Sequence, residues 1–270
     1  MKKLLALVLT LSMTMALAAC GQTKTTQKDQ ADTNASASDF AEISQKGKMV
    51  VGITDFEPMD YKDENGQWIG FDADLAKAFA DSLGLDVEFV EIEWDNKVLE
   101  LNGKSIDCVW NGMTLTGEVT SAMECSKPYC NNQQVVVVPA DKAANYQTAE
   151  SCKELKFAVE AGSAGEEMAE ENGFEYTPVK DQATAVMEVA SGTSDAAVID
   201  SLMAAAMVGE GTGYESLTYT VGLNSEEYGV GFRKGSDMAE KLNTFIEDAK
   251  KSGELEKIAE KYGVQAALIK

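Results

Sequence analysis

The stretch "KMVVGITDFEPMDYKDENGQWIGFDADLAKAFADSLGLDVEFVEI", residues 48–92, decides the fold. An apolar strand is expected at 48–54, a helix at 72–84 and an alternating strand at 86–92. In the helix, Leu75, Phe79 and Leu83 recur on one face, and Gly84 marks its end. A strand, a helix and a second strand in this order predict two parallel strands joined by a right-handed crossover.

The same alternation continues along the chain. A helix at 95–103 and a strand at 106–112 complete a βαβαβ unit. A second α/β unit follows, with strands expected at 133–138, 155–160 and 195–199, and helices at 163–173, 181–192 and 200–209. A strand at 228–232 and helices at 237–253 and 254–263 end the chain. The pattern predicts an α/β protein with about 230 residues of folded chain.

The first residues resemble an export signal. Lys2 and Lys3 precede an apolar run too short to span a bilayer, and "LAAC" ends at Cys20. We expect a signal peptide at 1–19 and a lipoprotein whose Cys20 carries diacylglycerol and a palmitate-type acyl chain, which together form a membrane anchor. The alternative is an ordinary secretory signal with a chance cysteine. Residues 20–39 lack large apolar side chains after the lipidated cysteine and are expected to form a disordered tether.

The composition excludes several classes of function. The formal net charge is −22, and it becomes −24 when Lys2 and Lys3 leave with the signal peptide, so nucleic acid is an unsuitable partner. The chain has no histidine, which removes the commonest general base and zinc ligand. We expect no cofactor, no metal site and no catalytic residues. Whether the cysteines Cys108, Cys125, Cys130 and Cys152 are paired or free stays open.

Polar groups follow three of the expected strands, where ligands of α/β proteins bind. Asn111 to Thr116 offer a glycine and two hydroxyls. Gly162 and Ser163 begin a helix whose free N–H groups would favour an anion, although a capped helix start explains them equally well. Asp200 ends an apolar strand and either awaits an ammonium group or caps the next helix.

The chain resembles the polar-amino-acid-binding proteins of bacterial ABC importers, the extracellular solute-binding family 3. The resemblance rests on residues 50–95 and on "IDCVWNGMTLT", "KPY", "FAVEAGSAGEE", "SDAAVIDS" and "YGVGFRKGSD", which follow the family order. It implies a type II periplasmic-binding-protein fold in which two α/β lobes are joined by two hinge strands. Lobe 1 would comprise 40–128 and 229–270, lobe 2 would comprise 134–223, and the hinges would lie at 129–133 and 224–228.

The resemblance also assigns ligand contacts. Phe56 and Trp94 match aromatic walls, and Gly112 and Thr114 match backbone and hydroxyl contacts. Ser163 matches the residue whose N–H meets the ligand carboxylate, and Asp200 matches the acid that receives the α-ammonium. The remaining expected ligand residues are Asp55, Asn111, Met113 and Thr116.

One position departs from the family pattern. The family reads T-x-E-R after the Gly-Thr segment, and its arginine grips the α-carboxylate, but here Val119 stands at that place. Arg233, the chain's only arginine, is predicted to lie at the surface. Three explanations stay open. The Ser163 helix end and the threonines could hold the carboxylate alone, the ligand could lack a free carboxylate, or Lys97 or Lys127 could substitute.

The expected function is that of a monomeric receptor without catalysis, held on the outer face of the cytoplasmic membrane. It would bind an amino acid or a related amine and deliver it to an ABC permease. An enzyme similar to cyclohexadienyl dehydratase is a second hypothesis, with Glu57, Glu93 or Glu160 as its general acid. A ligand sensor for a signalling partner is a third.

Overall fold

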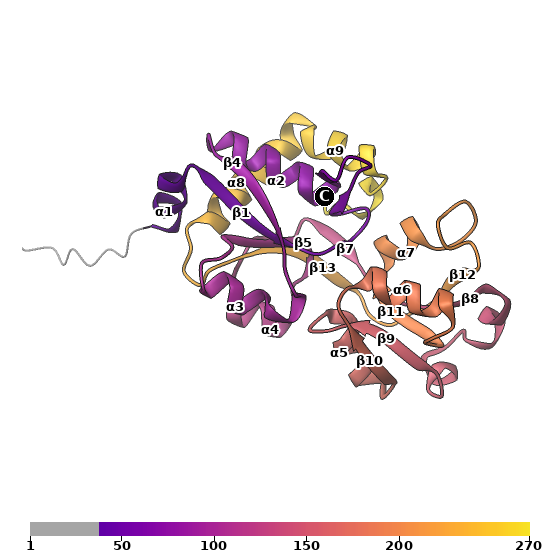
Figure 1. Ribbon diagram of the computed structural model, residues 1–270. Helices are drawn as coiled ribbons and strands as arrows, with labels where there is room; N and C mark the ends of the chain where they lie inside the picture. Colours follow the sequence, from indigo (N-terminus) through magenta and orange to yellow (C-terminus); the bar gives the residue numbers. More distant parts are fainter. Residues whose placement is uncertain (1–37) are drawn as a thin grey trace, which may run out of the picture. The chain divides into compact units, whose positions relative to one another are not determined.

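The computed structural model describes residues 38–270 and contains two main sheets, one in each lobe (Figure 1). The predicted cleavage and lipidation at Cys20 and nearly all of the predicted tether lie outside the described residues. Every helix and strand named from the sequence is present, with ends displaced by about two residues or fewer. Within residues 38–270, no helix combines the length and hydropathy needed to cross a bilayer.

The sheet of lobe 1 has the strand order β4-β1-β5-β13-β6, with β7 pairing to β13. Its strands are β1 (Lys48–Ile53), β4 (Asp86–Glu91), β5 (Cys108–Thr114), β6 (Glu124–Cys125), β7 (Cys130–Asn132) and β13 (Glu226–Phe232). β1 lies parallel to both β4 and β5, which confirms the parallel pairing predicted from the βαβαβ pattern, and β13 joins β5 antiparallel.

The helices of lobe 1 come from both ends of the chain. They are α1 (Asp39–Lys46), α2 (Phe71–Ser82), α3 (Lys97–Asn102), α4 (Gly117–Ala122), α8 (Met238–Ser252) and α9 (Glu254–Tyr262), with 3₁₀ turns η1 (Trp94–Asn96) and η4 (Gln265–Ala267). A small hairpin pairs β2 (Tyr61–Lys62) with β3 (Trp68–Ile69). The apolar face predicted for the first helix is buried, since α2 places Leu75 and Phe79 in the core.

The sheet of lobe 2 has the order β10-β9-β11-β8-β12. Its strands are β8 (Gln134–Pro139), β9 (Lys156–Glu160), β10 (Glu175–Val179), β11 (Ala196–Asp200) and β12 (Leu217–Gly222). Its helices are α5 (Ala164–Asn172), α6 (Gln182–Ser191) and α7 (Ser201–Met207), with 3₁₀ turns η2 (Ala140–Asn145) and η3 (Ala149–Cys152). β9 lies parallel to β10 and β11, so the carboxyl ends of β9 and β11 meet at one edge.

The chain passes between the two sheets twice. It leaves the first sheet after β7 and enters the second at β8, and it returns between β12 and β13 (Figure 1). We propose that the hinges lie at these crossings, as predicted at 129–133 and 224–228, with the lobe boundaries beside them. This proposal is supported by the change of sheet between Asn132 and Gln134 and between Gly222 and Glu226.

The prediction for Arg233 was wrong. Its side chain is only 12% exposed, and its guanidinium pairs with Asp39 at 2.6 Å and Asp107 at 3.1 Å. Asp39 was predicted to lie in the tether, but it begins α1. Its ion pair with Arg233 therefore joins this helix to the end of β13. The arginine is largely withdrawn from solvent because both carboxylates, and the carbonyl of Ile106 at 2.8 Å, satisfy its donors.

The cysteines carry free thiols in the part of the chain that the structure describes. Cys108, Cys130 and Cys152 are buried, and Cys125 is partly buried. Burial raises the pKa of the Cys125 thiol to about 11, so this thiol stays protonated at neutral pH.

Candidate functional site

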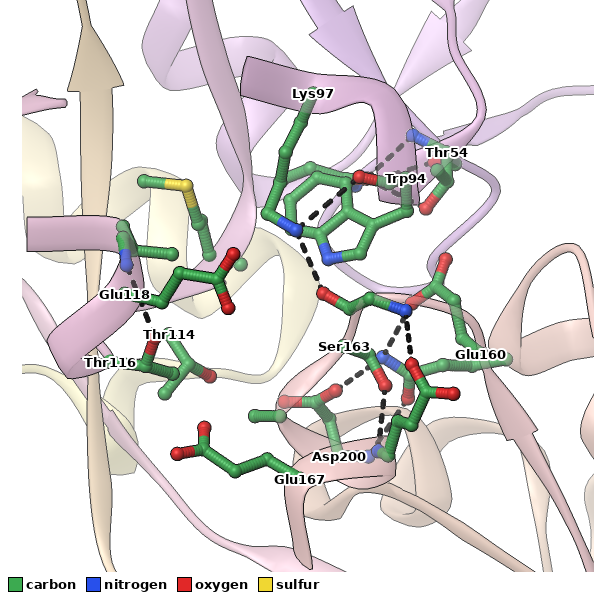
Figure 2. Close-up of a pocket in the computed structure, with 18 of the residues that line it drawn as sticks. Thr54, Trp94, Lys97, Thr114, Thr116, Glu118, Glu160, Ser163, Glu167 and Asp200 are labelled. Atoms are coloured by element: carbon green, nitrogen blue, oxygen red, sulfur yellow. Dashed lines mark hydrogen bonds between the residues drawn. The ribbon is translucent and has the colours of Figure 1, made fainter. Parts of the chain in front are cut away.

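A cleft of about 310 Å³ is lined by residues of both lobes (Figure 2). Except for Asp55, the ligand residues expected from the sequence line it: Phe56, Trp94, Asn111, Gly112, Met113, Thr114, Thr116, Ser163 and Asp200. Asp55 is exposed on the loop after β1 and does not belong to the lining. The structure therefore brings together side chains from the ends of β1, β5, β9 and β11.

Asn111 and Gly112 are held by lobe 1 itself. The Asn111 side chain accepts hydrogen bonds from the backbone N–H and the hydroxyl of Thr54, and its amide nitrogen donates to Asp60 at 2.9 Å. The Gly112 N–H donates to Asp72 at 2.6 Å. Burial raises the pKa of the Asp72 carboxyl to about 7, while the Gly112 hydrogen bond opposes this rise. These polar groups position the strand end and are already engaged within the lobe.

Gly112 makes room for an aromatic ring. Its φ is +53°, and a Cβ added there would lie 2.5 Å from Phe56 Cε1 and 3.2 Å from Tyr228 Cε2. The sequence predicted that this glycine would let a ligand approach the backbone. The structure shows that the missing side chain accommodates Phe56, which then forms part of the cleft wall.

The two threonines have internal partners. The Thr114 hydroxyl donates to Glu226 at 2.9 Å, and the Thr116 hydroxyl accepts from the Val119 N–H at 3.3 Å as the N-cap of α4. Val119, at the place of the family arginine, is 6% exposed and packs in an apolar cluster with Trp94. The charged side chain beside Val119 in this corner of the cleft is the acid Glu118.

Lys97 supplies a cation close to this corner. It begins α3, is 8% exposed and donates to the carbonyl oxygens of Gly162 at 2.7 Å and Trp94 at 3.3 Å (Figure 2). Burial lowers the pKa of its ammonium group. An ammonium has three donors, so one N–H remains for a ligand. Lys127, the other lysine considered, is exposed, pairs with Glu247 and does not line the cleft.

The Lys97 hydrogen bond to Gly162 joins lobe 1 to the loop before α5. Gly162 has φ +70°, and a Cβ there would lie 2.8 Å from Asp95 Cα, so the two lobes touch closely here. A second link joins Lys180 of lobe 2 to Glu91 of lobe 1 at 2.6 Å.

The N-terminus of α5 is capped, as the alternative interpretation of this segment stated. The Ser163 hydroxyl accepts from the Glu166 N–H at 3.1 Å, and the Gly162 N–H donates to the Glu166 carboxylate at 2.6 Å. The anion that the helix end favours is thus a side chain of the same helix. A ligand carboxylate at this end would have to displace Glu166.

Asp200 lies at the end of β11 and makes no side-chain cap on α7. Its Oδ1 accepts from Tyr228 at 2.6 Å, Gln134 at 3.1 Å and the amide of Asn132, and its Oδ2 accepts from Gln182. It is 4% exposed, and burial together with the nearby Glu226 raises the pKa of its carboxyl to about 8. Asp200 lines the cleft, and its Oδ2 accepts this one hydrogen bond among the described residues, which leaves it a further acceptor position.

Acidic residues dominate the lining. Besides Asp200, the cleft is lined by Glu118, Glu160, Glu166, Glu167 and Glu170, against Lys97 as the cation of this lining. Sequence reasoning missed most of these acids as ligand residues and named Glu160 only as an enzymatic acid. The "EE" repeats after Ser163 and the position of Glu160 at a strand end were the available signals.

Comparison with known proteins assigns the family. The model of the bacterial extracellular solute-binding proteins, family 3, matches residues 49–265. The arginine-binding extracellular protein ArtP of Bacillus subtilis is 29% identical, with 97% of this chain and 98% of that protein covered. A probable histidine-binding protein of Neisseria gonorrhoeae is 32% identical, with 99% of each chain covered.

Solved structures show the same fold. A mutant of ArgBP from T. maritima superposes with a TM-score of 0.76 at 33% identity, covering 83% of this chain and 98% of that one. An ancestral amino acid-binding protein, described as a precursor of cyclohexadienyl dehydratase, gives 0.76 at 34% identity and the same coverage. The two-lobed fold and the cleft between the lobes are consistent with the family that the sequence comparison assigns. The chain belongs to the bacterial extracellular solute-binding proteins, family 3.

Proposed function

We propose that this protein is the solute receptor of an ABC importer and that its ligand is a positively charged amino acid or a closely related amine. The observation that carries the proposal is the excess of acidic side chains in the cleft lining, where six acids stand against the one lysine, Lys97, among the described residues. Closely spaced carboxyls in a partly dry cleft favour a cation and disfavour an acidic ligand. Two relatives have names that fit this class, an arginine-binding and a probable histidine-binding protein. Others are named for cystine and glutamine, which carry no net positive charge, so the class rests on the cleft and not on these names.

Within this proposal, Lys97 takes the place of the absent arginine. Its free N–H would hold the ligand α-carboxylate beside Val119, and Asp200 Oδ2 would accept from the α-ammonium. Phe56 and Trp94 would flank the ligand. This arrangement favours a ligand with a carboxylate over the variant without one, because the carboxylate would accept the remaining N–H of the buried Lys97 ammonium group.

We further propose that ligand binding stabilises closure of the lobes. The contacts from Lys97 to Gly162 and from Lys180 to Glu91 are the kind of links that a closed form would keep. The closed form would be recognised by the permease.

Attachment through a lipid at Cys20, location on the outer face of the cytoplasmic membrane and a monomeric state are parts of the same proposal. The "LAAC" sequence and the small polar residues after it support the first two. Mass spectrometry of membrane-extracted protein tests the anchor: an unmodified Cys20 at the mature N-terminus would exclude it.

Of the three general acids considered for an enzyme, one lies in the cleft. Glu160 lines the cleft and burial raises its pKa to about 8, whereas Glu57 and Glu93 lie outside the lining. The similarity to a dehydratase precursor motivates the test. Incubation with prephenate or arogenate distinguishes the two functions, because a receptor releases its ligand unchanged.

The receptor proposal is tested by calorimetric titration of the purified, lipid-free protein. The panel should contain basic, neutral and acidic amino acids together with their amides and simple amines. Binding of basic amino acids with at least about tenfold preference over neutral ones of equal length supports the proposal. It is refuted if no amine or amino acid binds, or if acidic amino acids bind best.

A further inference from the structure

Glu160 is a buried acid whose hydrogen-bonding capacity is unused. It ends β9 at the carboxyl edge of the lobe 2 sheet, is 3% exposed and lines the cleft. Its Oε1 has no hydrogen-bond partner within the described residues, and its Oε2 lies 3.5 Å from Gln182 Nε2, the outer limit of a hydrogen bond. Buried polar atoms without partners are rare, and each one calls for an explanation.

The charges around Glu160 do not provide that partner. Asp200 from β11 and Asp181 from the N-cap of α6 face it from lobe 2, and Lys97 of α3 faces it from lobe 1. Lys97 gives two of its donors to backbone carbonyls, and the ion pairs found within residues 38–270 include none to Glu160. Burial, followed by the charges of Asp200 and Asp181, raises the pKa of Glu160 to about 8.

Glu160 and Asp200 are neighbours. They end two parallel strands that pair in the lobe 2 sheet, and both carboxyls contact the same nitrogen, Gln182 Nε2. In Figure 2 the Glu160 carboxyl points from the end of β9 toward the side of the cleft that carries Trp94. Two nitrogens separated by a short alkyl chain would therefore reach both acids, with the chain beside the indole.

We propose that Glu160 is a specificity-determining residue of this cleft: its free Oε1 accepts a hydrogen bond from a second cationic nitrogen of the ligand, while Asp200 holds the first. This inference rests on the proposed receptor function and narrows its ligand class to small molecules with two positively charged nitrogens, such as basic amino acids. The second nitrogen provides the partner that the buried oxygen lacks and the charge that the two acids together require.

The test compares ligands that differ only in the second charge. L-arginine and L-citrulline have the same shape, but citrulline carries a neutral urea, and L-lysine and L-norleucine form a second pair. Each is titrated calorimetrically into wild type, Glu160→Gln and Glu171→Gln. Glu171 is exposed on α5, outside the cleft lining, and its substitution removes the same charge.

We expect Glu160→Gln to weaken binding of the charged member of each pair by about 10- to 100-fold and the neutral member by less than about threefold. Glu171→Gln should leave both unchanged. An equal loss for charged and neutral ligands, or no loss, overturns the inference and leaves the receptor function standing. Failure of every amine and amino acid to bind wild type refutes the receptor function instead.

A measurement on wild type keeps the inference testable if Glu160→Gln does not fold, which its melting curve would show. Wild type should bind arginine at least about tenfold more tightly than citrulline at pH 8. Equal affinities would overturn the inference without any variant.

Discussion

Substituting Lys97 by methionine should separate recognition of the ligand carboxylate from closure of the cleft. Lys97 Nζ donates to the Gly162 carbonyl at 2.7 Å across the cleft and to the Trp94 carbonyl at 3.3 Å, with one N–H free. Methionine keeps most of the buried stem and removes all three donors. The variant therefore loses one hydrogen bond between the lobes, and also the proposed contact to a ligand carboxylate.

The two losses affect different ligands. A hydrogen bond to a charged partner contributes about 1.5–3 kcal/mol, so a ligand carboxylate should lose about 10- to 150-fold in affinity. The bond between the lobes also has a charged donor, so its loss can be as large, but it weakens every ligand to the same extent and cancels in a ratio of affinities. Removing a positive charge from this acidic lining also favours a cationic ligand, which reduces the common loss further.

The assay is calorimetric titration with an amino acid and the amine left when its carboxyl group is removed, with L-arginine and agmatine as the first pair. The ratio of the two affinities should fall by about 10- to 150-fold in Lys97→Met. Lys127→Met, at an exposed lysine paired with Glu247, is the matched control and should leave the ratio unchanged. An unchanged ratio in Lys97→Met would refute the substitution of Lys97 for the family arginine.

Three further perturbations follow from the structure. Glu160 and Asp200 have pKa values raised to about 8, so both carboxyls are protonated below that pH in the ligand-free protein. A bound cation should release these protons. The affinity for cations should therefore rise from pH 6 to 8, by up to about tenfold per pH unit for each group. Gly112→Ala should lower the free energy of unfolding by about 2–4 kcal/mol in urea denaturation, through positive-φ strain and overpacking against the aromatic wall. Arg233→Met should lower the free energy of unfolding by about 1.5–3 kcal/mol, because Asp39 loses its ion pair and the buried Asp107 is left with Lys46, whereas Lys251→Met in an exposed pair should cost less than about 0.5 kcal/mol.

Each of these expectations has a clear contrary result. Proton release is measured from the binding enthalpy in buffers of different ionisation enthalpy, and affinity that falls between pH 6 and 8 would contradict the assignment of protonated acids. A Gly112→Ala variant as stable as wild type would show that the Phe56 ring moves away from the added methyl group at little energetic cost. Equal effects of Arg233→Met and Lys251→Met would show that the buried ion pair adds nothing to stability.

Most of the fold was predictable from the sequence because the signals are local. The 3.6-residue apolar spacing of α2, the glycine that follows it and the apolar runs of β1 and β5 each act over a few residues. The motif order placed Phe56, Trp94 and Asp200 around one ligand, and these three residues line one cleft; their contacts to a ligand stay a prediction. Short elements without a clear period, such as α4 and β10, were not predicted.

The charge pattern of the cleft depends on contacts between residues far apart in the chain. Lys97 meets Gly162, and Asn132 meets Asp200, only because the two sheets fold and face one another. Asp39 meets Arg233 because the two ends of the chain come together in lobe 1. Whether a carboxyl is paired, capped by a helix or buried with a free oxygen is set by these contacts, and no local pattern encodes it. Residue spacing therefore revealed where a ligand would bind, while burial and long-range pairing established which groups remain available to bind it.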